Sequence, residues 1–188
     1  VGRFYEHLHS KRQDVLIQAF IDAQKRNVVF KDYKLILAGA YKEPDGKNYL
    51  QKLKKLIGNN TAIELHLNIN TDELTDLYGR AQFYWHATGY DSNIEKEPEK
   101  AEHFGISIVE AMSFGTIPIA YAAGGPIETI ISEKTGFLFN TVSELITYTG
   151  KLIQDQSLYK TIQKKAIDHV QNKFGYKVFQ KQVKSLLI

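Results

Sequence analysis

Short apolar segments alternate with longer segments of helical periodicity along most of this 188-residue chain. The apolar segments expected to be strands lie at residues 1–4, 33–39, 63–67, 82–86 and 117–120. The helical periodicity is clearest at residues 14–21, 49–57 and 71–78, and again after residue 140. Strands that alternate with helices are typical of a parallel sheet with right-handed crossover connections. We therefore predict an α/β fold, a Rossmann-like parallel sheet flanked by helices.

Glycine and polar residues follow the expected strands. Arg3 ends the first strand, Gly39 ends the second, and residues 68–70, 86–89 and 123–125 follow the other three. In open parallel sheets, ligands bind beyond the carboxyl ends of the strands. We expect these residues to lie around one ligand site.

The segment from Glu102 to Gly115 places one acidic residue before an expected helix and another on it. Gly105 permits close backbone approach, and the free N–H groups of Gly105 and Ile106 at the helix start favour an anion such as a diphosphate. The carboxylates of Glu102 and Glu110 can accept hydrogen bonds from hydroxyl groups on either side of it. The alternative is an amphipathic helix with two solvated carboxylates.

Composition excludes several classes of protein. A chain of this length buries about 70% of its unfolded surface, so it needs no disulfide or metal to fold. The absence of cysteine excludes thiol nucleophiles and Cys-ligated zinc, and it permits a cytoplasmic location. No apolar run approaches the ~20 residues of a membrane span. The net charge of +3 is too small and too dispersed to predict a nucleic-acid partner.

The segment Glu102–Gly115 also resembles the E-x7-E signature of the retaining nucleotide-sugar glycosyltransferases of family 4 (group 1), which have the GT-B fold. Residues 115–120 and 123–130 resemble the strand and the glycine turn that follow this signature in the family. Residues 1–4 with Lys11, Asp14, Leu16 and Ile17 resemble its opening segment. Four motifs in the same order are far more specific than one.

The resemblance implies a role for the charged residues of these motifs. Arg3 and Lys11 bind the diphosphate of the donor, with Arg12 as the alternative to Lys11. Glu110 accepts from the ribose diol, and Glu102 contacts the donor sugar. The resemblance implies that no metal is required, because the positive charges and the helix end replace a divalent cation. It implies no cofactor either, because the nucleoside-diphosphate sugar is itself the substrate. The family's reaction is described as a front-face displacement without an enzyme nucleophile.

Other residues are expected in the substrate site on weaker grounds. His103 adjoins Glu102 and is expected to touch the diphosphate or the sugar, and Gly124 and Gly125 belong to the glycine turn. Backbone groups from Leu67 to Ile69 are the expected contacts for the base. The base, the sugar and the acceptor, whether a glycan or a lipid-linked molecule, are not predicted.

The resemblance also implies that residues 1–188 are one donor-binding domain, with a C-terminal helical segment at 140–188. The chain starts abruptly on a strand-like segment, and its single methionine is Met112. We expect a fragment that lacks its N-terminal acceptor domain and is inactive without it. The full-length protein is expected to be cytoplasmic, and peripheral binding to a membrane surface is compatible with this expectation.

Several alternatives stay open. A nucleotide-sugar epimerase of the same fold and a non-enzymatic carbohydrate-binding module are the rival functions. His7 and His9 form an H-x-H pair that suits either a metal or a solvent-facing turn, and His86 is expected to form a hydrogen bond at a strand end. The polar segment 89–102 is either a lid or a solvated insertion. Phe83 and Trp85 are expected in the core.

Overall fold

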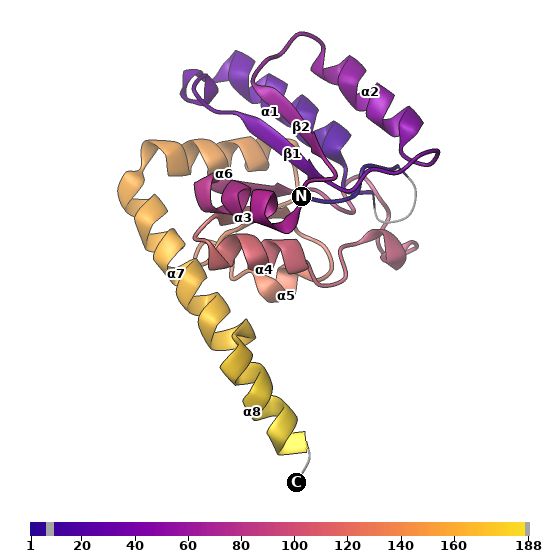
Figure 1. Ribbon diagram of the computed structural model, residues 1–188. Helices are drawn as coiled ribbons and strands as arrows, with labels where there is room; N and C mark the ends of the chain where they lie inside the picture. The colour runs from indigo at the N-terminus through magenta and orange to yellow at the C-terminus, as the bar shows by residue number, and fades with distance from the viewer. Residues whose placement is uncertain (7–9, 187–188) are drawn as a thin grey trace.

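All strand pairs in the computed structural model, which describes residues 1–6 and 10–186, are parallel. β1 (Leu35–Gly39) pairs with β2 (Ile63–Leu67) in one sheet. β4 (Ile117–Tyr121) lies between β3 (Phe83–His86) and β5 (Phe137–Phe139) in a second sheet. The predicted α/β fold with helix-flanked parallel strands is confirmed (Figure 1).

Eight α-helices in the described part of the chain precede, connect or follow these strands. They are α1 (Gln13–Arg26), α2 (Lys47–Ile57), α3 (Thr71–Arg80), α4 (Ile106–Ser113), α5 (Pro126–Thr129), α6 (Val142–Gln154), α7 (Gln156–Phe174) and α8 (Tyr176–Leu186), with short 3-10 turns η1 (Val28–Phe30) and η2 (Pro98–Lys100). Local signals start two of them: Asn70 and Glu73 form a capping box at α3, and Thr141 and Glu144 form another at α6. The last helix, α8, projects away from the body (Figure 1).

Three details differ from the sequence predictions. Residues 1–4 form no strand, although Gly2 N–H and Phe4 N–H donate to the carbonyls of Ala38 and Ala40 at 2.8 and 2.9 Å. The strand β5 was not expected, because three residues are too few to show a period. The strands form two sheets instead of one, because no hydrogen-bonded pairing among the described residues joins β1 to β3; a cavity of about 390 Å³ has residues of both strands in its lining, among them Ile36 and Phe83.

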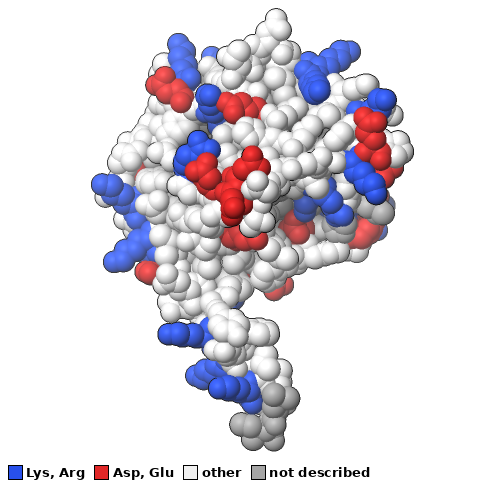
Figure 2. Space-filling view, viewed as in Figure 1, with Lys and Arg blue, Asp and Glu red and all other residues white. Residues whose placement is uncertain are grey.

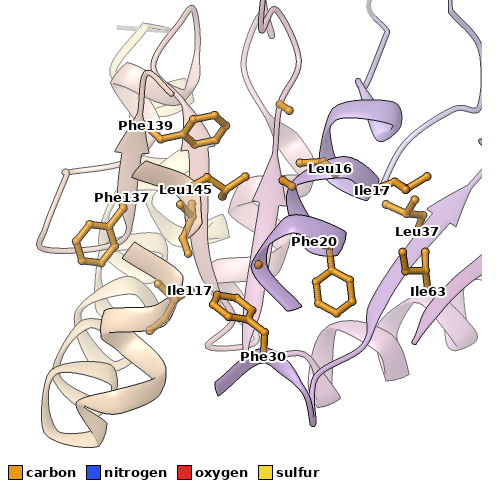
Figure 3. Close-up of a cluster of buried hydrophobic side chains, with 14 of the residues drawn as sticks. Leu16, Ile17, Phe20, Phe30, Leu37, Ile63, Ile117, Phe137, Phe139 and Leu145 are labelled. Carbon is orange, nitrogen blue, oxygen red and sulfur yellow. The ribbon is translucent and has the colours of Figure 1, made fainter. Parts of the chain in front are cut away.

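The helix α1 joins the two sheets through one hydrophobic core (Figure 3). Leu16, Ile17 and Phe20 of α1 belong to the same buried cluster as Leu37 of β1 and Ile117 of β4. Each fully buried side chain of this size contributes roughly 1.5 to 3 kcal/mol. This packing fixes the carboxyl ends of the two sheets relative to each other.

The aromatic strand β3 packs as predicted, with Phe83 and Trp85 against the core cluster. The Trp85 indole N–H donates to Thr149 Oγ1 at 2.9 Å, so its polar atom is satisfied inside α6. The neighbouring Tyr84 points to the second buried cluster, which contains Met112 of α4. The side chains of β3 therefore alternate between the two buried clusters, and His86 at the end of the strand lies on the same face as Tyr84.

Charged groups of both signs are interspersed over the face shown in Figure 2. The projecting helix α8 differs, because it carries Lys177, Lys181 and Lys184 and no acidic residue. Its aromatic residues Tyr176 and Phe179 are exposed. Within residues 1–6 and 10–186, no helix combines the length and the apolar character needed to cross a membrane.

Candidate functional site

The carboxylate of Glu102 meets the ammonium group of Lys11, ninety-one positions away, near the start of α4. Lys11 Nζ lies 2.5 Å from Glu102 Oε2, and the two side chains are 18% and 14% exposed. Lys11 lies two residues before the start of α1, whereas Glu102 lies in the loop before α4. The fold thus brings together two residues that were assigned to the donor from separate motifs.

Glycine at position 2 lets the Lys11 side chain reach this position. Gly2 has a φ of +154°, and a Cβ atom there would lie 2.5 Å from Lys11 Cγ. A larger residue would force the lysine stem away from its path. The neighbouring Arg12 is directed elsewhere, since its guanidinium contacts the carbonyl of Tyr90 and the carboxylate of Asp91. Lys11, not Arg12, is therefore the cation at Glu102.

A second residue, His86, approaches the same carboxylate from the end of β3. His86 Nε2 lies 3.2 Å from Glu102 Oε2, and the side chain is only 3% exposed. The ring nitrogen is buried, and no hydrogen bond of good geometry joins it to a described residue, although it lies close enough to Glu102 to act on the carboxylate. Glu102 Oε2 is thus flanked by two nitrogen groups.

These neighbours set the charge states. Burial alone would raise the pKa of the Glu102 carboxyl, but the His86 ring and the Lys11 ammonium outweigh it and hold that pKa well below its usual range. Burial lowers the pKa of His86, and the positive charge of Lys11 adds to this effect, whereas Glu102 opposes it. At neutral pH the site therefore contains an ionised Glu102 and a neutral His86.

The helix α4 begins at this cluster. Gly105 is its N-cap with a φ of +87°, a conformation that glycine adopts without strain. The first N–H groups of a helix have no partner within it, and they face any group bound ahead of α4. The N-terminus of α4 therefore presents donors beside a carboxylate and an ammonium group.

Glu110 lies further along α4 in different surroundings. Its side chain is exposed, and Glu110 Oε2 accepts from the Tyr78 hydroxyl at 3.2 Å. Both acidic residues act on the buried Tyr84: burial raises the pKa of its hydroxyl, and the charges of Glu102 and Glu110 raise it further. The Tyr84 hydroxyl donates to Ser107 Oγ at 2.8 Å and so ties β3 to α4.

The glycine turn supports the Glu102 loop from behind. Gly125 N–H donates to the Glu102 carbonyl at 2.7 Å. A Cβ at Gly124 would lie 2.3 Å from Glu102 O, and one at Gly125 would lie 2.5 Å from Phe104 Cα. Only residues without a Cβ allow this approach of two backbones. The structure thus places Gly124 and Gly125 as packing partners of the loop.

The other predicted residues lie apart from this cluster or at its edge. Arg3 is exposed, and its guanidinium lies 4.8 Å from the centre of the Tyr5 ring. The side chain of His103 is exposed next to Glu102. Leu67 ends β2 and Ile69 precedes α3, and no hydrogen bond or ion pair among the described residues joins either to Glu102 or Glu110.

No group of three or more acidic or histidine residues in the described part of the chain could hold a metal ion. His7 and His9 lie outside the described residues. The segment 89–102 is anchored at its start by the contacts of Arg12 with Tyr90 and Asp91. Whether this segment acts as a lid stays a prediction.

Sequence reasoning missed the partners of the two carboxylates. His86 was expected near the ligand site with a hydrogen bond at a strand end, but its contact with Glu102 was not predicted, and Tyr78 was not singled out. The place of His86 at the carboxyl end of a strand predicted the ligand site but not the residue that His86 contacts, because that contact joins distant segments. For Tyr78 the sequence holds no comparable signal.

The model of the family "Glycosyl transferases group 1" matches residues 1–169. The chain belongs to this family. The predicted resemblance to a group 1 glycosyltransferase is confirmed, and the match favours neither an epimerase nor a carbohydrate-binding module.

Similar proteins agree with this assignment. A GDP-Man:Man(3)GlcNAc(2)-PP-Dol alpha-1,2-mannosyltransferase of Dictyostelium discoideum is 32% identical over 139 residues, which are 72% of this chain and 25% of that protein. An alpha-1,3/1,6-mannosyltransferase of Rhizomucor pusillus is 26% identical over 194 residues, 95% of this chain and 43% of that protein. This group 1 chain therefore spans less than half the length of these relatives.

Solved structures share the fold. Anabaena HepE in complex with UDP-glucose has a TM-score of 0.77 and 23% identity, covering 99% of this chain and 47% of that chain. The C-terminal domain of the group 1 protein LpcC from Francisella tularensis has a TM-score of 0.70 and 23% identity, covering 93% of this chain and 85% of that chain. The fold of this chain is that of a glycosyltransferase C-terminal domain.

Proposed function

We propose that this chain is the donor-binding half of a retaining glycosyltransferase and binds a nucleoside-diphosphate sugar ahead of α4. The observation that carries this proposal is the contact of Lys11 with Glu102 at the start of that helix. An ammonium group and free helix N–H groups suit a diphosphate, while a carboxylate suits sugar hydroxyls. Family membership over residues 1–169 supports the same assignment.

The diphosphate would take the Lys11 ammonium as its main partner. An ammonium group and a helix N-terminus stabilise the negative charge that develops on the leaving phosphate when the glycosidic bond breaks. Arg3 is exposed and long enough to turn from Tyr5 toward a bound phosphate. With these charges in place, the proposed site needs no metal.

The two carboxylates would bind different parts of the donor. Glu110 is exposed on α4 and accepts only from Tyr78 among the described residues, so its second oxygen can accept from a ribose diol. Glu102 is held at the helix start, where it would accept from the donor sugar. Backbone groups from Leu67 to Ile69, at the carboxyl end of β2, remain the proposed contacts of the base.

The acceptor would bind between this chain and an N-terminal domain of the whole protein. The relatives that span more than twice this length support such a second domain. Holding the acceptor against the donor supplies roughly 7 to 11 kcal/mol of the barrier, so we expect this chain to bind donor with almost no transfer. A lipid-linked acceptor would place the whole protein at a membrane surface.

The test is calorimetric titration with UDP, GDP, UDP-glucose and GDP-mannose in the presence of EDTA. GDP-mannose is included because the Dictyostelium relative is named for GDP-Man, and UDP-glucose because HepE was solved with it. We expect at least one nucleotide and its sugar conjugate to bind without a divalent cation. Binding should weaken with salt, because the charges involved are partly solvated.

Lys11→Met is the decisive variant, and Lys134→Met, on the exposed segment before β5, is its control. Loss of binding in Lys11→Met alone would support the site. Absence of binding for all four ligands, or strict dependence on magnesium or manganese, would contradict the proposal.

A further inference from the structure

The ring of His86 is a buried polar group that the proposed donor site has not used. Its Nε2 atom is turned toward Glu102 at 3.2 Å but forms no hydrogen bond among the described residues. Buried polar atoms in native proteins almost always have a partner, and exceptions concentrate where a ligand or a change of state supplies one. The position of His86 therefore calls for a functional explanation.

The ring cannot easily turn to find another partner. It stacks on Tyr84, with ring centres 6.1 Å apart and planes inclined by 20°. Tyr84 is itself held, because its hydroxyl donates to Ser107 Oγ at 2.8 Å. The ring of His86 is thus fixed by strand and helix, whereas Glu102 lies in a loop and can adjust.

Lys11 is the residue whose ion-pair partner would change when a donor binds. In the structure it contacts the same carboxylate oxygen that faces His86, Glu102 Oε2. A diphosphate carries more negative charge than one carboxylate and draws an ammonium group toward itself. Glu102 would then lose its strongest partner while its side chain remains only 14% exposed.

His86 is the one other side-chain nitrogen group among the described residues that lies within 4 Å of a Glu102 oxygen, at 3.2 Å. A small shift of the carboxylate would align it with the ring nitrogen. A neutral imidazole can donate one N–H, and a carboxylate beside Nε2 favours the tautomer with the proton on that atom. The other oxygen of Glu102 would stay available for a sugar hydroxyl.

Resting on the proposed function, we propose that His86 is a positioning residue that takes over Glu102 from Lys11 when the donor diphosphate binds. The Nε2–H of His86 then donates to Glu102 Oε2 and orients the carboxylate toward the donor sugar. His86 acts on recognition of the sugar and not of the nucleotide. This separates it from Lys11, which serves the diphosphate.

The test compares His86→Phe with His86→Gln, in titrations with UDP, UDP-glucose, GDP and GDP-mannose. Phenylalanine keeps a ring against Tyr84 but has no donor, whereas the glutamine amide can place an N–H close to the position of Nε2. We expect His86→Phe to weaken binding of the sugar conjugate roughly 5- to 20-fold and that of the free nucleotide less than about twofold. His86→Gln should recover most of the loss.

Two controls separate positioning from folding. His169→Phe removes another histidine contact, that of Nε2 with the Thr129 carbonyl at 3.1 Å, and should change neither affinity. In the Glu102→Ala background, His86→Phe should cause no further loss, because its effect passes through Glu102. Melting curves of all variants show whether the affinities come from folded protein.

A measurement on the wild-type protein guards against a variant that does not fold. Nitrogen-15 NMR of the His86 ring should show its Nε2–H become hydrogen-bonded on addition of UDP or GDP. Equal losses for nucleotide and conjugate, no rescue by His86→Gln, or an unchanged Nε2 signal would overturn the inference. If the wild-type chain binds none of the ligands, the donor site itself is wrong and the inference is rejected with it.

Discussion

The two carboxylates that flank the start of α4 belong to one short sequence signature, but they lie in opposite surroundings. Glu102 is largely buried and faces Lys11 from before α1 and His86 from β3. Glu110 is exposed on the helix, and among the described residues its carboxylate accepts a hydrogen bond only from the Tyr78 hydroxyl. The position of Glu110 follows from the helix, whereas that of Glu102 depends on packing between distant segments.

This difference means that indirect damage should affect the two residues unequally. A change that moves the loop should abolish the function of Glu102 and spare that of Glu110. Removal of a partner should affect Glu102 strongly and Glu110 weakly.

The largest effect is expected from Gly125→Ala. The new Cβ would lie 2.5 Å from Phe104 Cα and 2.6 Å from the His103 carbonyl, and these are backbone atoms that cannot yield cheaply. We expect a loss of roughly 3 kcal/mol in the free energy of unfolding, measured with denaturant. Binding of a sugar conjugate should fall more than binding of the free nucleotide, because Glu102 is displaced.

Gly79→Ala is the matched control for this substitution. Gly79 lies inside α3, and nothing is within 4 Å of a Cβ built there. Alanine should stabilise the protein by about 0.5 to 1 kcal/mol through its higher helix propensity. Similar destabilisation by both substitutions would show that the contact with the Glu102 loop is not the cause.

Glu110→Ala should reduce nucleotide affinity by about 1.5 to 3 kcal/mol, roughly 10- to 100-fold, if the carboxylate accepts from the ribose. The free energy of unfolding should not change, since the side chain is exposed. Titration with nucleotide and denaturation of the same sample check both statements. Unchanged binding with unchanged stability would remove Glu110 from the site.

Lowering the pH should reduce the stability that the ionised Glu102 provides. Because the pKa of Glu102 in the folded chain is below its ordinary value of 4.5, its ionised form adds stability above pH 4.5 that is lost as the pH falls toward the folded-state pKa. Glu102→Gln should lower the free energy of unfolding at pH 7 by roughly 1 to 2 kcal/mol. The difference from wild type should shrink steadily below pH 4.5 in denaturation curves.

The titration of His86 also lowers the free energy of unfolding as the pH falls, but it does so over a higher pH range than that of Glu102. Its pKa is lowered in the folded chain, so the unfolded chain binds its proton first as the pH falls below the ordinary value of 6.5. Stability is therefore already expected to decline between pH 6.5 and 4.5. A constant difference between Glu102→Gln and wild type at all pH values would contradict the assigned charge of Glu102.

The smallest effect is expected from Tyr78→Phe. This substitution removes the one hydroxyl among the described residues that donates a hydrogen bond to Glu110. Water can donate in its place, because the carboxylate is exposed. Nucleotide affinity should change by less than about threefold, or under ~0.7 kcal/mol. A loss as large as that of Glu110→Ala would show that Glu110 also depends on its partner, and the contrast with Glu102 would fail.

The sequence by itself determined the elements whose signals are local. The capped start of α3 follows from Asn70 and Glu73, three positions apart, and the start of α4 follows from Gly105. Helical and strand periods also extend over only a few residues. They were therefore sufficient to predict the α/β fold, and the ordered motifs were sufficient to predict the family.

Only the tertiary structure decided which residues surround Glu102. Lys11 and Glu102 are ninety-one positions apart, and their contact depends on the packing of α1 against both sheets and on the close approach that Gly2 permits. The orientation of His86 likewise depends on Tyr84 and on its bond to α4. Contacts of this kind form when distant segments share one core, and no period or cap within a segment encodes them.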